Sequence, residues 1–251
     1  MTALTGAPVV GVGTPESEWA AWPTLADLPA LDLNPDLGRD PATGPGPLVV
    51  APHPDDEVLG AGGLLAMAGG EVVAVTDGEA SHPGSTVFRA ADLALARRAE
   101  TRAALAGLGR PATVVHHLGH PDGHVDERLL TDQLEAVLAP GRWCVVTWRS
   151  DGHPDHEATG RAAAAACAAT GARLLEYPVW AWHWARPDDP RVPWDRARRL
   201  SLQPWTRAAK QAAVGCFTTQ VRPIGPDLAD APVLPDHVLA RFARPFEIFF
   251  T

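Results

Sequence analysis

Residues 48–57, Leu-Val-Val-Ala-Pro-His-Pro-Asp-Asp-Glu, place four apolar residues directly before a turn rich in imidazole and carboxylate groups. The apolar run has the length and composition of a buried strand. In an open parallel sheet, ligands bind just beyond the carboxyl ends of the strands. The segment therefore predicts a parallel sheet and also the place of its functional site.

From residue 48 onward, short apolar runs alternate with alanine-rich helical stretches, which is typical of a mostly parallel sheet covered by helices. The predicted strands are 48–51, 71–76, 112–118, 143–148, 174–184 and a closing edge strand at 244–250. The predicted helices are 60–69, 88–108, 127–138, 155–170 and 206–217. We expect an N-terminal arm over 1–46, with a helical piece at 16–28, and a hinge at 41–47 that leads into one domain over 47–251.

Composition narrows the classes of function. The chain has 251 residues and a formal net charge of −9, so its surface should repel nucleic acid. The longest apolar stretch without charge, 58–70, is too short for a membrane span, and no cation precedes Arg39 as a secretory signal would require. Three scattered cysteines without a CxxC motif indicate core thiols in a reducing cytoplasm.

The polar turn after the first strand has the residues of a metal site. Asp55 and Asp56 are adjacent carboxylates whose repulsion a divalent cation would relieve. His53 and Asp56, three residues apart on a tight turn, can face one ion. Asp55 then faces another way and remains free to handle protons.

A second polar turn follows another predicted strand, in Asp151-Gly-His-Pro-Asp-His156. Because a catalytic zinc site uses about three protein ligands and one open position, His156 is the expected third ligand. His153 then lies close to the metal, and Asp155 is expected to accept its ring N–H. Each His-Pro-Asp tripeptide taken alone is also a plausible turn, and a third copy at 120–122 is interpreted as the rim of the site.

The two motifs together resemble those of the LmbE-like, or PIG-L, family of zinc-dependent de-N-acetylases. Further similarity lies in Thr76-Asp-Gly-Glu79, Arg97-Arg-Ala-Glu100 and Leu118-Gly-His-Pro-Asp-Gly123. The resemblance implies a Rossmann-like three-layer α/β sandwich without a nucleotide. It also implies a small-molecule amino-sugar substrate, with a homo-oligomer possible.

Carried over to this sequence, the resemblance assigns His53, Asp56 and His156 to zinc. It makes Asp55 the general base, His153 the group that stabilises the oxyanion or protonates the amine, and Asp155 the orienting partner of His153. In the implied mechanism zinc lowers the pKa of a water toward roughly 7, Asp55 takes its proton as it attacks an acetamide carbonyl, and zinc with protonated His153 stabilises the oxyanion.

Arg97 and Asp122 match positions that contact the sugar in relatives. For Arg97 a surface ion pair with Glu100 or Asp92 is the equal alternative. Some family members place a tyrosine just before the second motif, whereas Tyr177 is the only tyrosine of this chain, which leaves the oxyanion arrangement open.

Residues 177–184, Tyr-Pro-Val-Trp-Ala-Trp-His-Trp, alternate as a strand would and place Trp180, Trp182 and Trp184 on one face. This face is either an apolar wall against the substrate or, as we favour, a surface that helices cover. Two other functions stay open besides deacetylation of an amino sugar. One is a zinc amidase for another amide, such as a thiol-sugar conjugate or an acylated antibiotic, and the other is a non-catalytic metal-dependent carbohydrate-binding protein.

Overall fold

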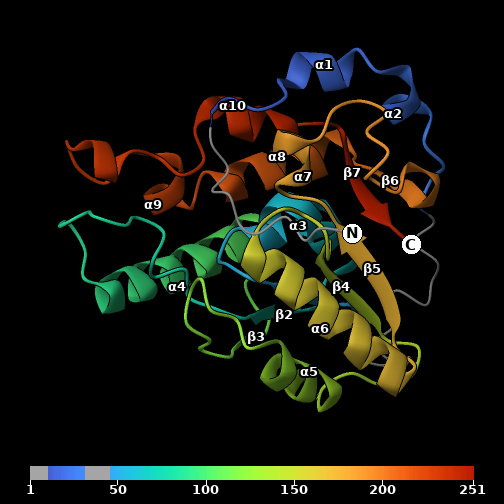
Figure 1. The fold of residues 1–251 in the computed structure, drawn as a ribbon, viewed down its shortest axis with the longest axis horizontal. Coiled ribbons are helices and arrows are strands. Elements are labelled where there is room, and N and C mark those ends of the chain that lie inside the picture. The colour runs from blue at the N-terminus through green and yellow to red at the C-terminus, as the bar shows by residue number, and fades with distance from the viewer. Residues whose placement is uncertain (1–10, 32–45) are drawn as a thin grey trace.

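A computed structural model describes residues 11–31 and 46–251. They form a single α/β domain around a seven-stranded sheet, with helices on both sides (Figure 1). The strands are β1 Leu48–Ala51, β2 Glu71–Ala74, β3 Val115–His117, β4 Trp143–Thr147, β5 Arg173–Tyr177, β6 Ala197–Ser201 and β7 Phe246–Phe250. The predicted three-layer α/β architecture is confirmed.

The strand order is β3-β2-β1-β4-β5-β7-β6, and the first five strands are parallel. β7 runs antiparallel to both of its neighbours. The chain winds from β1 toward β3 on one side and from β4 toward β5 on the other. The crevice between β1 and β4 is therefore the point at which strand order reverses, and open α/β sheets bind their ligands at such a point.

Alternate side chains of the central strands enter two separate cores, as the period of a strand requires. Leu48 and Val50 pack with α5 and α6, whereas Val49 faces the core that contains α3 and α8. The α-helices are α1 Glu16–Ala20, α2 Pro23–Asp27, α3 Asp56–Ala68, α4 Ala90–Gly107, α5 Glu127–Glu135, α6 Pro154–Thr170, α7 Ala181–Trp184, α8 Pro204–Val214, α9 Thr218–Val221 and α10 Asp236–Leu239. Three 3₁₀ turns lie at Trp194–Arg196, Leu228–Asp230 and Ala240–Phe242.

Helix α3 begins four residues before the predicted start, so Asp56 and Glu57 of the metal-site motif lie in its first turn. The helix breaks at Ala61, where the backbone leaves helical geometry (φ −135°). Lys210 Nζ donates to Leu59 O (2.8 Å), the carbonyl just before the break. Glu247 accepts from the backbone N–H groups of Gly63 (2.6 Å) and Leu64 (3.0 Å) just after it.

Two predictions about the later strands are wrong. The strand expected over 174–184 ends at Tyr177, and Trp182 and Trp184 lie on the short helix α7. The cause is Asp151, which accepts the N–H groups of Val179, Trp180 and Ala181 and so turns the chain away from the sheet. The closing strand β7 is not an edge, because β6, which the sequence pattern did not predict, pairs along its outer side.

The part of the arm that the structure describes lies on the far edge of the sheet. Trp19 is fully buried, with its ring 5.0 Å from that of Trp182, and Leu31 N donates to Arg199 O (2.9 Å) of the outermost strand β6. The predicted helical piece at 16–28 is confirmed as α1 and α2. Residues 41–45 of the predicted hinge lie outside the described residues.

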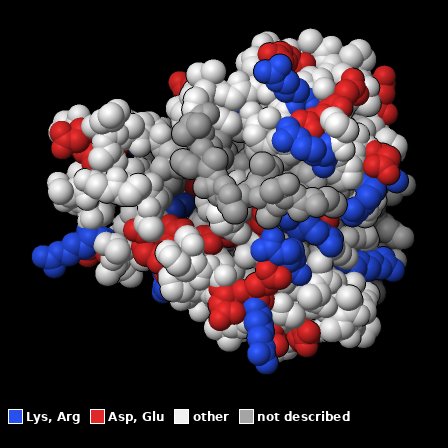
Figure 2. Space-filling model, in the orientation of Figure 1, with Lys and Arg blue, Asp and Glu red and all other residues white. Residues whose placement is uncertain are grey.

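The visible surface carries charged side chains of both signs. On the face shown in Figure 2, basic and acidic side chains are intermingled, without an extended area of basic side chains alone. Within 11–31 and 46–251, the helices lack the combination of length and apolar content that a membrane crossing needs.

Candidate metal centre and active site

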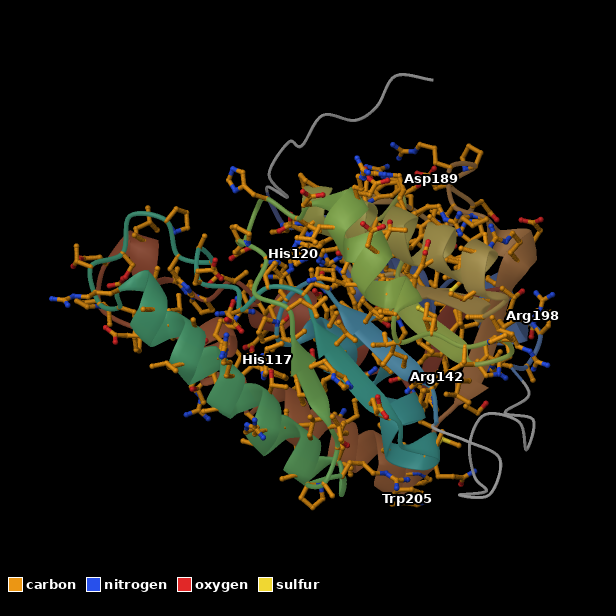
Figure 3. All side chains as sticks on the ribbon, turned by 90° about the horizontal axis from the view of Figure 1, so that it is seen from below. His117, His120, Arg142, Asp189, Arg198 and Trp205 are labelled. Carbon is orange, nitrogen blue, oxygen red and sulfur yellow. The ribbon has the colours of Figure 1, made fainter. Side chains whose placement is uncertain are left out.

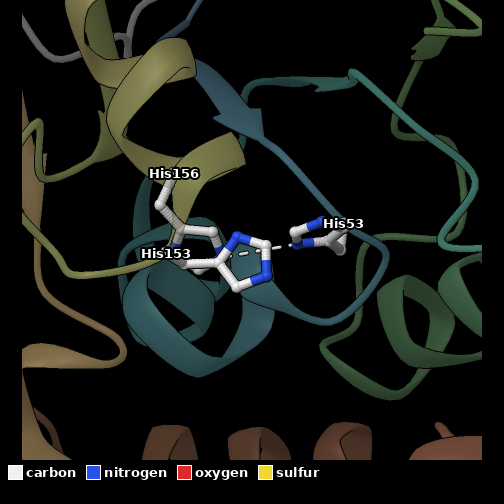
Figure 4. Close-up of side chains that lie close together, drawn as sticks. All are labelled: His53, His153 and His156. Atoms are coloured by element: carbon white, nitrogen blue, oxygen red, sulfur yellow. Dashed lines mark hydrogen bonds between the residues drawn. The ribbon is translucent and has the colours of Figure 1, made fainter. Parts of the chain in front are cut away.

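The two polar turns meet at the reversal point of the sheet. The first follows β1 and the second follows β4, and these two strands pair directly. Figure 4 shows the rings of His153 and His156, from the start of α6, converging on that of His53. The predicted approach of residues about a hundred positions apart in sequence is thus present in the fold.

Three atoms form a nearly equilateral triangle. His53 Nδ1 and His156 Nε2 each lie 3.2 Å from Asp56 Oδ2, and the two nitrogens are 3.3 Å apart. Ligand atoms about 2.0–2.1 Å from a tetrahedral zinc ion lie roughly 3.3 Å from one another. The triangle therefore has the size of one face of a zinc coordination sphere.

Hydrogen-bond partners on the outer sides of the His53 and His156 rings make the triangle suitable for binding a cation. His156 Nδ1 lies 2.8 Å from Asp151 Oδ2, and His53 Nε2 lies 3.1 Å from a carboxylate oxygen. A neutral imidazole that donates from one nitrogen has a lone pair on the other. When both rings are neutral, lone pairs of two nitrogens and one carboxylate oxygen therefore converge. Against the opposing effect of burial, Asp56 and Asp151 raise the pKa of His156 to about 9, so this position attracts positive charge.

Asp151 is the functional residue that the sequence reasoning missed. Its side chain is fully buried, and it orients His156 while fixing the backbone after β5. A carboxylate that holds a ligating histidine is a common feature of metal sites. The available signal was its place as the first residue of the second motif.

Asp155 orients a different histidine from the one expected, and Asp122, which lines the cavity, contacts that same histidine. The Asp155 carboxylate lies 3.1 Å from His53 Nε2 and also accepts from Gly123 N (2.7 Å), so it orients His53 rather than His153. Asp122 Oδ1 lies 3.1 Å from the same His53 nitrogen, while Asp122 Oδ2 accepts from Ala80 N (2.9 Å). His53, Asp122 and Asp155 form a second group with metal-binding spacing, as do His53, His153 and His156.

His153 lies beside the triangle, with its ring centroid 4.8 Å from that of His156. Its Nδ1 accepts from Asp155 N (3.2 Å), so in the neutral ring the proton is on Nε2. Burial and the neighbouring imidazoles lower the pKa of His153 to about 3. In its neutral form the ring can donate a hydrogen bond from Nε2, in contrast to the protonated form expected from the sequence.

Asp55 is not part of the triangle. It precedes α3 with a φ of 123°, which is rare for a residue with a side chain, and its N–H donates to Glu57 Oε2 (3.0 Å). Burial raises the pKa of Asp55 to about 7, although Arg97 acts in the opposite direction. A carboxyl group with such a pKa suits proton transfer at neutral pH.

Arg97 is buried and holds Asp55 in this conformation. Its Nη2 donates to Pro54 O (2.6 Å) and Asp55 Oδ2 (3.1 Å), and its Nη1 donates to Gly78 O (2.8 Å). The surface ion pair with Glu100 or Asp92 is not formed. A Cβ at Gly78 would lie 1.7 Å from Arg97 Nη1, so only glycine allows this approach.

A cavity of about 390 Å³ opens over these groups. Its lining combines polar residues of the triangle and its surroundings with apolar residues from four segments. They are His53, Asp55, Asp56, Leu59, Ala80, Ser81, Pro83, Arg97, Asp122, Gly123, His153, Val179, Trp180, Gln220, Val233 and Leu234. Tyr177 does not line it, because its hydroxyl donates to Val50 O inside the core.

Residues 48–167 match the family model described as PIG-L, GlcNAc-PI de-N-acetylase. The chain carries a PIG-L (LmbE-like) family domain. Both polar turns lie within the matched residues. The description of this family model names a deacetylase, which is an amide hydrolase. No curated protein gives a significant match to the sequence.

Solved structures share the fold of this PIG-L domain. A conserved protein from Thermus thermophilus is 26% identical, with a TM-score of 0.57 over 83% of this chain and 94% of that chain. The N,N'-diacetylchitobiose deacetylase from Pyrococcus horikoshii is 19% identical, with a TM-score of 0.53 over 78% and 73%. The zinc-inhibited form of teicoplanin deacetylase Orf2 is 21% identical, with a TM-score of 0.57 over 81% and 96%.

Proposed function

We propose that this protein is a zinc-dependent hydrolase that removes an N-acetyl group from an amino sugar or a small molecule containing one. The observation that carries the proposal is the triangle of lone pairs beside a carboxylate that is not part of it. The description of the family and the substrates named for the similar deacetylases support the choice of an N-acetyl substrate.

In this proposal His53, Asp56 and His156 hold the zinc ion, since nitrogen and carboxylate donors at this spacing fit zinc. A bound zinc ion supplies Lewis-acid chemistry, because it makes a water more acidic and polarises an amide carbonyl. Asp151 and the pair of Asp122 and Asp155 keep the two histidines in the required tautomers.

Asp55 is the general base in this proposal, because it lines the cavity next to the triangle while Arg97 fixes one of its oxygens. It takes a proton from the attacking water and later delivers it to the leaving amine. His153 donates from Nε2 toward the oxygen that becomes negative, and loss of such a donor in other enzymes costs about 2.7–4 kcal/mol of barrier. In this proposal the neutral His153 ring replaces the tyrosine of some family members as the hydrogen-bond donor to the oxyanion.

Another amide, such as a thiol-sugar conjugate or an acylated antibiotic, is the second candidate, and the apolar part of the cavity favours it. We also propose that the protein acts in a reducing compartment such as the cytoplasm, since Cys144, Cys167 and Cys216 are all unpaired.

An acetate-release assay over a panel of N-acetyl amino sugars and their conjugates tests the proposal. We expect acetate from at least one member, loss of release after dialysis against a chelator, and recovery when zinc is added back. Acetate release that persists after verified removal of metal would contradict the zinc mechanism.

A further inference from the structure

The cavity has a polar side and an apolar wall, and the proposed chemistry uses only the polar side. The wall consists of Leu59, Pro83, Val179, Trp180, Val233 and Leu234. Its members come from four segments that are distant in sequence, so the wall is assembled by the fold and not by one local apolar run.

The two outer parts of this wall are held firmly. Trp180 N donates to the same Asp151 oxygen that orients His156, which ties the tryptophan to the triangle. Leu234 N donates to Gln220 O (2.9 Å), and the buried Gln220 amide donates to Ser81 Oγ (3.3 Å), which also lines the cavity. A wall fixed in this way can select the shape of a ligand.

Trp180 differs from the two other tryptophans of its segment. The ring of Trp182 is covered by the Arg244 guanidinium at 4.1 Å, and that of Trp184 by Arg191 at 4.5 Å. Trp180 and Trp184 are both partly buried, but of the three tryptophans only Trp180 lines the cavity. Of the two interpretations of the three tryptophans, packing holds for Trp182 and Trp184, whereas Trp180 is placed to contact a ligand.

The charges of the cavity disfavour an anionic ligand. Among the described residues that line it, Arg97 is the only lysine or arginine, and both of its terminal nitrogens already bond to Asp55 and two backbone carbonyls. The carboxylates of Asp55, Asp56 and Asp122 face the same space. With the amide at the proposed zinc ion, a phosphate group elsewhere in the cavity would meet these carboxylates without a free cation.

We propose that the substrate is an uncharged amide that carries a hydrocarbon or aryl group, and that Trp180 and Leu234 receive this group. The inference rests on the proposed hydrolysis and deepens it. An apolar group that fills such a wall contributes strongly, since even one methylene in a hydrophobic pocket changes kcat/KM by about 10–200-fold.

Four substrates test the inference through the rate of amine release: N-acetylglucosamine, its phenyl glycoside, N-octanoylglucosamine and N-acetylglucosamine 1-phosphate. We expect kcat/KM for the phenyl or the octanoyl compound to exceed that for N-acetylglucosamine by about tenfold or more. The compound with the raised kcat/KM shows whether the wall receives the group on the amine side or the group on the acyl side of the amide. The phosphate should be the poorest substrate.

Trp180→Ala and Leu234→Ala should reduce this preference about tenfold. Trp205→Ala is the matched control, because Trp205 is 60% exposed, lies on α8 and does not line the cavity; Figure 3 shows it at the bottom of the view, below His120. It should keep the preference. Equal rates for all uncharged compounds, a preference for the phosphate, or a preference that survives in Trp180→Ala would each overturn the inference.

Calorimetric binding of the hydrolysis products separates this inference from the proposed function. Phenyl glucosaminide should bind about tenfold more tightly than glucosamine, or octanoate about tenfold more tightly than acetate, to the wild type but not to Trp180→Ala. This result does not depend on turnover. Equal affinities within both pairs would overturn the inference, whereas absence of hydrolysis together with the predicted affinities would count only against the proposed function.

Discussion

At the scale of single residues, the proposed metal ligands and the proposed general base, Asp55, are different residues. Asp55→Asn keeps the size of the side chain and its distance from the triangle but removes the base. We expect it to retain zinc and to lose turnover by about 10²–10⁴-fold. His156→Ala should lose both zinc and turnover, because it removes one corner of the triangle.

Metal analysis beside the acetate assay checks both variants. Normal turnover of Asp55→Asn, or full zinc content of His156→Ala with normal turnover, would show that the roles are assigned wrongly.

The sequence could predict which residues form the site but not all of their partners. His53, Asp56 and His156 follow from donor chemistry and from their place after strands, which are local features. The contact of Asp155 with His53 depends on how the start of α6 lies against the first turn. The contact of Arg97 with Asp55 likewise joins α4 to that turn. These two contacts cannot be predicted from the spacing of the residues along the chain.

At the scale of elements, the broken helix α3 supports the site, since its first turn carries Asp56. Lys210 and Glu247 satisfy the backbone groups freed by the break, and their charged atoms lie 2.7 Å apart in the interior. Glu247→Gln leaves the Lys210 ammonium buried without its counter-charge. We expect the free energy of unfolding to fall by about 3–5 kcal/mol.

Denaturant unfolding measures this change, and Glu127→Gln is a suitable control. Its ion pair with Arg161 is 46% exposed on both sides, so its loss should cost about 0–1 kcal/mol. Similar effects of the two substitutions would argue against the role of Glu247 at the break.

The wrong strand prediction for 174–184 is explained by a contact between residues that are distant in sequence. Alternation of tryptophan with smaller residues satisfies the strand pattern, and nothing local opposes it. The bonds from Asp151 to three successive N–H groups stop the strand, and Asp151 lies almost 30 residues earlier. A local sequence pattern does not reveal hydrogen bonds between the backbone and a side chain so distant in sequence.

At the scale of the whole molecule, the arm is fixed by aromatic packing. Trp19 contacts the rings of Trp22, Trp182 and Trp194, and its Nε1 donates to Trp182 O (3.0 Å). Trp19→Ala removes the centre of this cluster, so we expect a loss of about 3–5 kcal/mol. Cleavage by protease within 11–31 should become faster than in the wild type and in the exposed control Trp205→Ala. Unchanged cleavage and melting temperature would mean that other contacts hold the arm.

The position of bound zinc tests the central claim most directly. Crystals grown with one equivalent of zinc, measured on both sides of the zinc absorption edge, locate the ion by anomalous scattering. The account predicts one peak within bonding distance of His53 Nδ1, Asp56 Oδ2 and His156 Nε2, with Asp55 outside the coordination sphere. A peak instead at His53 Nε2 between Asp122 and Asp155, or a bond from Asp55 to the ion, would contradict it.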